Sequence, residues 1–305
     1  MTSFANKFVG AIDQGTTSSR FILFNQQGDI VSVAQEEFPQ YTPNEGECEH
    51  DAMEILTSVN NTIRQALQQS NPKNTLGRDI APDEVACVGI TNQRETTVVW
   101  NRATGKPYHN ALVWMDMRTK PICDDIIAEG AGQDQLRSAV GLPISPYFAG
   151  TKLKWLLAQP DSLSGAGTVG DAALRGEVMF GTIDSWLVWN LTGGTNGGVH
   201  VTDVTNASRT MMMNINTCTW NDAICKDVFG VPTSVLPAIK SSSEGYGTCA
   251  AGTALPNVPL SGILGDQQAA LFGQAAYNSG QAKNTYGTGC FMLVNTGTDC
   301  VPSRN

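Results

Sequence analysis

The chain has 305 residues, of which 41% are hydrophobic and 15% are charged. This composition is ordinary for a globular protein and excludes a disordered or coiled-coil chain. Lysine and arginine number 19 against 28 aspartates and glutamates, so the net charge is -9, a sign that repels nucleic acid and anionic membrane surfaces. We therefore expect no nucleic-acid partner.

Apolar segments of the chain all fall short of the roughly 20 residues that a membrane helix needs. The stretch from Met1 to Ile12 has neither the basic start nor the long apolar run of a secretion signal. Eight cysteines are scattered without a C-x-x-C pair, and only three histidines accompany them, so neither a zinc site nor a disulfide framework is expected. The sequence predicts a cytoplasmic protein with no membrane insertion.

Three short apolar runs open the chain, at Phe8 to Ile12, Phe21 to Phe24 and Ile30 to Ala34. Turn-forming residues separate these runs, so the pattern predicts an antiparallel meander of three strands. Asp51 with Glu54 three residues later resembles a capping box, and apolar residues then recur at helical spacing. A helix is therefore expected after the three strands.

Strands and helices alternate in the middle of the chain. We expect strands at 85–90 and 96–100, a further apolar run at 111–114, and helices near 119–129, 151–158 and 183–191. Three strands, a helix and then this alternation indicate an α/β fold whose sheet is mixed. The expected architecture is a ribonuclease-H-like domain with a mixed five-stranded sheet and helices on both faces.

A second hairpin is predicted near the end of the chain. A helix at about 266–277 precedes apolar runs at 283–285 and 291–295, which a Gly/Thr turn separates as in the first hairpin. We therefore expect residues 1–275 to form one large domain and residues 276–305 to begin a second, similar one.

The turn from Asp13 to Arg20 concentrates groups that bind phosphate. Gly15 permits a tight turn, Arg20 adds charge, and the Asp13 carboxylate can hold a Mg²⁺ ion directly or through water. The hydroxyl groups between them belong to Thr16, Thr17, Ser18 and Ser19. The alternative is a hairpin turn made of turn-favouring residues, and the spacing is not that of a Walker A loop.

Other polar residues stand where strands or helices begin and end. Arg94 offers a fork of donors and Glu95 a pair of acceptors, which suit a substrate with vicinal hydroxyls, or else form a local ion pair. Asp266 is either the N-cap of a helix or a carboxylate that accepts a hydroxyl proton. Trp114 ends an apolar run and is either a core residue or part of a site.

Together these residues resemble the glycerol kinases, which belong to the FGGY carbohydrate kinases with the actin and sugar-kinase type of fold. Several long strings carry the likeness, and they cover residues 10–20, 89–100, 111–114, 146–157, 181–193, 199–211, 265–273 and 282–295. The resemblance implies transfer of phosphate from ATP to glycerol, giving ADP and sn-glycerol 3-phosphate, with Mg²⁺ required.

The resemblance also implies a role for each candidate site residue. The ligands expected for the ATP phosphates are Thr16, Thr17, Ser18, Arg20 and Thr288, and Asp13 is expected to hold the metal. The residues expected to bind glycerol are Arg94, Glu95, Trp114, Tyr147, Asp266, Gln267 and Phe291. Trp114 and Phe291 would cover the carbon face of glycerol, and Asp266 would be the catalytic general base.

The family's second domain carries its adenosine pocket, which would lie after Asn305. We therefore expect the 305-residue chain by itself to have little or no kinase activity, because no cleft can close over the nucleotide. The resemblance allows a homo-oligomer for the full-length protein. Two alternatives stay open: a related kinase of a longer polyol or sugar, such as a xylulose kinase, and a non-catalytic protein that binds glycerol.

Overall fold

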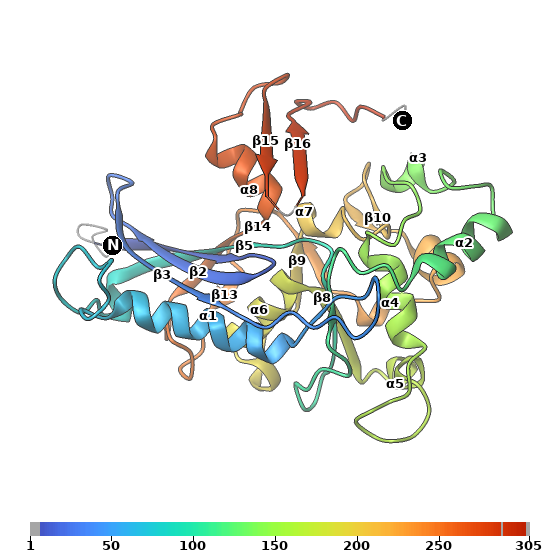
Figure 1. Cartoon of the computed structure of the whole chain (residues 1–305), viewed down its shortest axis with the longest axis horizontal. Helices are drawn as coiled ribbons and strands as arrows, with labels where there is room; N and C mark the ends of the chain where they lie inside the picture. Colours follow the sequence, from blue (N-terminus) through green and yellow to red (C-terminus); the bar gives the residue numbers. More distant parts are fainter. Residues whose placement is uncertain (1–6, 288, 303–305) are drawn as a thin grey trace.

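A six-stranded mixed sheet organises the fold in a computed structural model that describes residues 7–287 and 289–302 (Figure 1). Its strands, in spatial order, are β13 (Gly247–Thr248), β14 (Pro259–Gly265), β5 (Val85–Asn92), β1 (Phe8–Gln14), β2 (Ser18–Phe24) and β3 (Ile30–Glu37). β1, β2 and β3 form the predicted antiparallel meander, and β5 and β14 run parallel to β1. The five long strands confirm the expected ribonuclease-H-like sheet, to which the two-residue β13 adds a sixth strand at one edge.

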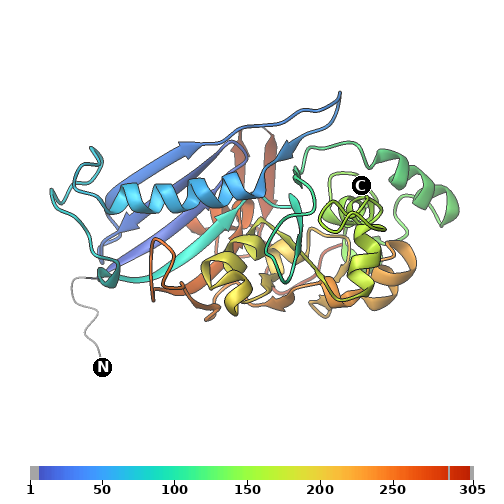
Figure 2. The same cartoon turned by 90° about the horizontal axis from the view of Figure 1, so that it is seen from below.

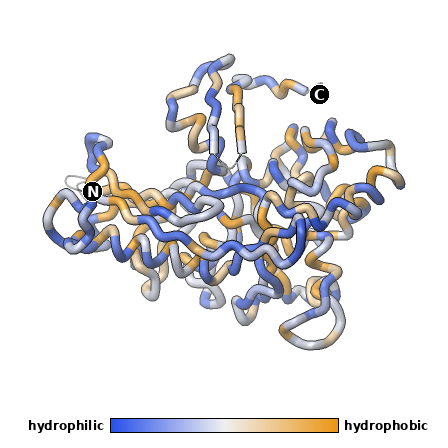
Figure 3. Tube along the Cα trace, in the orientation of Figure 1, coloured by the Kyte–Doolittle hydropathy of each residue, from blue (hydrophilic) through white to orange (hydrophobic). Residues whose placement is uncertain are grey.

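Helices pack on both faces of this sheet. α1 (Ala52–Leu67) contacts β2 and β3, and α6 (Ile183–Leu191) lies beside it, where the Trp186 indole donates to the carbonyl of Ala52 at 2.8 Å (Figure 2). α8 (Asp266–Gly273) contacts β14 and β5 from the other side (Figure 1). Apolar stretches run through the N-terminal strands (Figure 3), and their side chains meet α1 in a core that includes Phe21 and Leu23, both fully buried.

The start of α1 follows the sequence expectation only in part. The Asp51 carboxylate accepts a hydrogen bond from the amide of Met53 at 2.7 Å, as an N-cap residue does. Glu54 does not close a capping box, because its carboxylate instead accepts from the Tyr41 hydroxyl at 3.0 Å. The N-cap alone marks this end of the helix.

A second, antiparallel sheet has the order β4 (Glu49–His50), β7 (Ala111–Leu112), β6 (Thr97–Asn101) and β8 (Val178–Thr182). Strand β8 was not expected, because all of its residues are buried and its sequence carries no alternation. α2 (Lys120–Glu129) and α4 (Ala149–Leu157) contribute to a second core beside this sheet. The chain passes from the first sheet to the second between β5 and β6, through residues 93–96.

The last helix and the second hairpin were placed correctly but with different bounds. α8 ends at Gly273 rather than near residue 277, and Ala275 just beyond it has φ 57°. β15 (Ala282–Tyr286) and β16 (Cys290–Val294) form the predicted hairpin, which packs on α8 and projects from the rest of the molecule (Figure 1). Within the described part of the chain, no helix has the length and apolar character needed to cross a membrane.

Shorter elements complete the structure. They are the 3-10 turns Pro82–Glu84, Gly194–Asn196 and Thr233–Val235, the π-helical turn Ile224–Val228, the helices α3 (Arg137–Val140), α5 (Val169–Leu174) and α7 (Val204–Ala207), and the strands β9 (Val201–Asp203), β10 (Met213–Asn214), β11 (Thr219–Trp220) and β12 (Ala238–Lys240).

Candidate active site

A pocket of about 170 Å³ lies where the chain crosses between the two sheets. This volume is well below the roughly 300–1,000 Å³ of sites for drug-sized ligands, so the pocket suits a small molecule. Its lining includes all seven residues predicted to bind the substrate, namely Arg94, Glu95, Trp114, Tyr147, Asp266, Gln267 and Phe291. Residues that are distant in the sequence therefore meet around one cavity.

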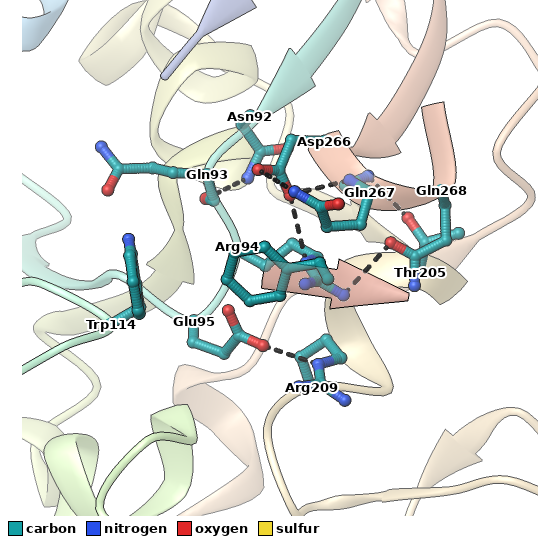
Figure 4. Close-up of polar contacts among 12 residues, drawn as sticks. Asn92, Gln93, Arg94, Glu95, Trp114, Thr205, Arg209, Asp266, Gln267 and Gln268 are labelled. Carbon is teal, nitrogen blue, oxygen red and sulfur yellow. Dashed lines mark hydrogen bonds and ion pairs between the residues drawn. The ribbon is translucent and has the colours of Figure 1, made fainter. Parts of the chain in front are cut away.

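Arg94 reaches the pocket from the end of β5 and pairs with Asp266, at the start of α8. The two are 3.2 Å apart between Nε and Oδ1, and the arginine side chain is only 6% exposed (Figure 4). Gly265 makes this approach possible, because a Cβ atom there would lie 2.6 Å from Cδ of Arg94. Arg94 and Glu95 therefore do not form the local ion pair that was considered as an alternative, because each pairs with a residue far away in the sequence.

Glu95 is held by Arg209 in a strained position. Its φ is 59°, a left-handed conformation that is uncommon outside glycine and is often found at functional sites. Arg209 Nε donates to Oε1 of this 2% exposed carboxylate at 2.6 Å (Figure 4). The guanidinium also lies over the rings of Phe148 and Tyr147, at 4.8 and 5.6 Å from their centroids. One arginine thus supports two predicted substrate residues.

Asp266 is the first residue of α8, and Gly265 rather than Asp266 is its N-cap. The carboxylate accepts from the backbone amide of Gln267 at 2.8 Å and from its side-chain amide at 3.1 Å. The N-cap interpretation of Asp266 is therefore wrong. With 37% of its side chain exposed, the carboxylate faces the pocket and is open to accept a hydroxyl proton.

Three aromatic rings enclose the pocket. The centroid of Trp114 lies 5.6 Å from that of Tyr147 and 6.0 Å from that of Phe291, both in edge-to-face geometry. Arg94 sits over the Phe291 ring at 5.8 Å. Burial raises the pKa of Tyr147 to about 12, so its hydroxyl stays protonated at neutral pH. Trp114 is half-buried and lines the cavity, which rules out a purely core role.

The first hairpin turn borders the same pocket through Thr16. The Trp114 indole nitrogen donates to the Thr16 hydroxyl at 3.0 Å. Arg20 pairs with Asp13 at 3.3 Å on the strands that lead to the turn. The other phosphate candidates Thr17 and Ser18 stand on this turn outside the cavity lining, and Thr288 lies outside the described residues.

Comparison with known proteins assigns the chain to a family. Residues 8–273 match the sequence model described as "FGGY family of carbohydrate kinases, N-terminal domain". The chain belongs to this family. The glycerol kinases of Methylobacterium radiotolerans and Clavibacter michiganensis are 52% and 53% identical to it, over 98% and 99% of this chain. The chain spans 56% of the length of each of these relatives.

Solved structures of FGGY kinases have the same fold. The glycerol kinase of Plasmodium falciparum with ADP matches with a TM-score of 0.87 and 35% identity, over 98% of this chain and 56% of that one. A xylulose kinase from Lactobacillus acidophilus matches with a TM-score of 0.77 and 20% identity, over 94% of this chain and 54% of that one. At this lower identity the likeness shows the fold alone.

The first hairpin of this domain carries a partly buried carboxylate, that of Asp13, whose oxygens are the kind of ligand that a divalent cation takes. Burial raises the pKa of Asp13, and the neighbouring charge of Asp266 raises it further while Arg20 lowers it. A cation beside Asp13 would stabilise the ionised carboxylate, which burial disfavours. Within residues 7–287 and 289–302 no three His, Cys, Asp or Glu side chains gather as a metal cluster.

Several site residues were missed by sequence reasoning. Gln93 lines the pocket and donates to Gln14 Oε1 and to the carbonyl of Gly15, both at 3.1 Å, so it connects the pocket to the first hairpin turn. Lys283 donates to the side chains of Gln267 and Thr285. Gln93, Arg209 and Lys283 all stand in the strings that carry the family resemblance, but their partners become visible only in the fold.

Proposed function

We propose that the protein to which this chain belongs transfers the γ-phosphoryl group of ATP to glycerol, giving sn-glycerol 3-phosphate and ADP. The observation that carries this proposal is the convergence of Arg94, Glu95 and Asp266 on a small cavity walled by aromatic rings and bordered by a phosphate turn. The glycerol kinases at 52–53% identity support the same substrate.

Glycerol fits the chemistry of the pocket lining. Glu95 and Asp266 accept hydrogen bonds from hydroxyls, and Arg94 donates them. The rings of Trp114 and Phe291 suit the carbon face of a short polyol. The pocket is small, at about 170 Å³, and the relatives at 52–53% identity are glycerol kinases, so a xylulose-like substrate is the weaker candidate.

The turn from Asp13 to Arg20, here called the phosphate turn, is proposed to bind the phosphate donor, and Asp266 to activate the acceptor hydroxyl. Thr16, Thr17, Ser18 and Arg20 are proposed to bind the ATP phosphates, together with Thr288, and Asp13 to hold Mg²⁺, which neutralises phosphate charge when bound. Asp266 is proposed to accept the proton of the glycerol hydroxyl whose oxygen attacks the γ-phosphorus. Phosphoryl transfer demands mainly in-line positioning and charge neutralisation, so this proton can leave late.

The wider setting of this activity is also proposed. All eight cysteines are free thiols, as expected in a reducing compartment, and ATP is a co-substrate, so we propose a cytoplasmic location. The division into domains 1–275 and 276–305 and a homo-oligomeric assembly remain predictions.

Calorimetry on the 305-residue chain tests the substrate. Glycerol is expected to bind at millimolar concentration, and Glu95→Gln is expected to weaken it by at least about tenfold, since a charged hydrogen bond contributes about 1.5–3 kcal/mol. Xylulose should bind more weakly than glycerol. Absence of glycerol binding at millimolar concentration, or equal binding of xylulose, would contradict the proposal.

The transfer step is tested by glycerol-dependent ADP release in the full-length protein. Asp266→Asn removes the proton acceptor but keeps the size of the side chain. Its kcat is expected to fall by about 10²–10⁴-fold, as is typical for loss of a general base. An unchanged kcat would show that Asp266 does not take the proton.

A further inference from the structure

Lys152 is a fully buried lysine in the first turn of α4, just behind the aromatic wall of the pocket. Because side chains on a helix lean toward its N-terminus, the ammonium group reaches back past the start of α4. There it donates to three backbone carbonyls, those of Trp114 at 3.5 Å, Tyr147 at 3.2 Å and Pro146. All of these acceptors belong to two segments that line or adjoin the pocket.

Burying an ammonium group is costly, so its retention here calls for a reason. Lysine is almost never fully buried unless it is paired, and a hydrophobic side chain of similar volume would often be equally stable at such a place. An apolar residue could fill the space but could not hold carbonyl oxygens. The ammonium group can therefore hold the two backbone segments at a fixed distance from each other, which an apolar side chain cannot do.

Those two segments carry two of the three rings around the cavity. Trp114 and Tyr147 meet edge to face at 5.6 Å, although they come from separate parts of the chain. The amide of Trp114 is held by the Thr96 hydroxyl at 3.2 Å, and its carbonyl by Lys152. Tyr147 is held through its own carbonyl by the same ammonium group.

We infer that Lys152 is a positioning residue for the glycerol pocket, whose ammonium group sets the separation of Trp114 and Tyr147. The inference rests on the proposed function, because glycerol is taken to be the ligand of this pocket. Lys152 itself touches neither substrate nor reacting atoms. A change at Lys152 should therefore lower the affinity for glycerol, whatever it does to overall stability.

The charge of Lys152 makes this role sensitive to pH. Burial lowers the pKa of Lys152 to about 8, against the opposing charges of Asp116 and Glu95, while Arg118 lowers it further. The nearby thiol of Cys123 has its pKa raised by burial and keeps its proton. A neutral amine has two N–H groups for three carbonyls and turns a lone pair toward one of them, so the pocket should loosen above pH 8.

Stability and affinity should then change in opposite directions. The pKa of Lys152 in the folded chain lies below the usual value of 10.5, so between about pH 8 and 10.5 the unfolded chain binds more protons. In that window the contribution of Lys152 to the free energy of unfolding rises with pH. If Lys152 had only a structural role, the affinity for glycerol would stay constant with increasing pH while the free energy of unfolding rose.

The experiment is calorimetry of glycerol binding to the 305-residue chain with Lys152→Met, which keeps an unbranched side chain one atom shorter than lysine and removes the donors. The matched control is Lys154→Met on the same helix, because Lys154 donates to the carbonyl of Val228 at 2.8 Å, away from the pocket. Lys152→Met should weaken glycerol binding at least tenfold at pH 7, and Lys154→Met should leave it unchanged. Equal affinity of Lys152→Met and the unchanged chain would overturn the inference.

A pH series on the unchanged chain tests the same point without relying on a variant that folds. If only the protonated form binds well, the Kd for glycerol should rise about tenfold between pH 7 and pH 9, since the competent fraction falls by that factor. A constant Kd across that range would overturn the inference. Lys154→Met should follow the unchanged chain.

Hydrogen exchange separates this inference from the proposed function. With no glycerol added, the amides near Trp114 and Tyr147 should exchange faster in Lys152→Met than in Lys154→Met. Faster exchange in a chain that does not bind glycerol would contradict the proposed function and leave the positioning role standing. Unchanged exchange in a chain that does bind glycerol would contradict the positioning role alone.

Discussion

At the scale of single residues, the Trp114 indole connects the pocket to the first hairpin turn through one hydrogen bond. Its ring forms one wall of the pocket, and its nitrogen donates to the Thr16 hydroxyl on the phosphate turn at 3.0 Å. This leaves the Thr16 proton free to point toward a phosphate oxygen. In the proposed function the ring would contact the carbons of glycerol and the nitrogen would act on a phosphate group through Thr16, so substitutions can separate the two roles.

Trp114→Phe keeps an aromatic wall and removes the donor. We expect the affinity of the chain for glycerol to stay within about threefold, while its affinity for sn-glycerol 3-phosphate falls by about fivefold, the effect of one hydrogen bond of about 1 kcal/mol. Calorimetry with both ligands measures the difference. Trp155→Phe is the control, because Trp155 contacts His109 and Arg118 instead; equal losses for both ligands in Trp114→Phe would refute the division of roles.

At the scale of elements, the position of α4 depends on a close approach to the segment that carries Arg209. A Cβ atom at Gly150 would lie 2.6 Å from the carbonyl oxygen of Thr210 and 3.1 Å from the ring of Phe229. Only glycine permits this contact. The approach matters for the site because α4 carries Lys152 and the neighbouring segment supports Glu95.

Gly150→Ala should therefore destabilise the chain by about 1–3 kcal/mol, the usual cost of overpacking, although alanine favours helices by about 1 kcal/mol. Gly273→Ala, at the end of α8, is the matched control, since a Cβ atom there meets nothing within 4 Å. Urea unfolding measures both. If the two variants proved equally stable, the close contact at Gly150 would not govern the packing of α4.

At the scale of the whole molecule, buried titratable groups set the response to acid. Burial lowers the pKa values of His50 and His200 to about 4, below the usual 6.5 of a histidine. Burial and the charge of Asp203 raise the pKa of Asp184 from 3.8 to about 6. The histidines bind more protons when the chain unfolds, and Asp184 binds fewer, so their effects oppose each other.

The two histidines should outweigh the aspartate as pH falls. Between pH 6.5 and 4 the contribution of each histidine to the free energy of unfolding falls by about 3 kcal/mol, at about 1.4 kcal/mol per pKa unit. The contribution of Asp184 rises by a similar amount as this residue protonates below pH 6. We expect a net loss of about 3 kcal/mol from pH 7 to 4 in urea unfolding. His200→Gln should flatten this dependence and Asp184→Asn should steepen it; the same pH dependence in both variants would contradict the assignment.

Much of the fold followed from local chemistry in the sequence. The meander β1 to β3, the N-cap at Asp51 and the second hairpin were predicted because turn residues, caps and apolar spacing act between near neighbours. Strand β8 was missed because a fully buried strand has no alternation to reveal it. The end of α8 was missed because the left-handed backbone at Ala275 has no glycine to mark it.

The sequence by itself determined which residues could carry the chemistry, since carboxylates, guanidinium groups and hydroxyls at the ends of strands keep their properties wherever the chain places them. Only the tertiary structure decided their partners. Arg94 pairs with Asp266 rather than with the adjacent Glu95, and Glu95 pairs with Arg209. The physical reason is that these pairs, like the contact of Lys152 with the carbonyl of Trp114, form between segments that are far apart in the sequence and meet only in the packed fold.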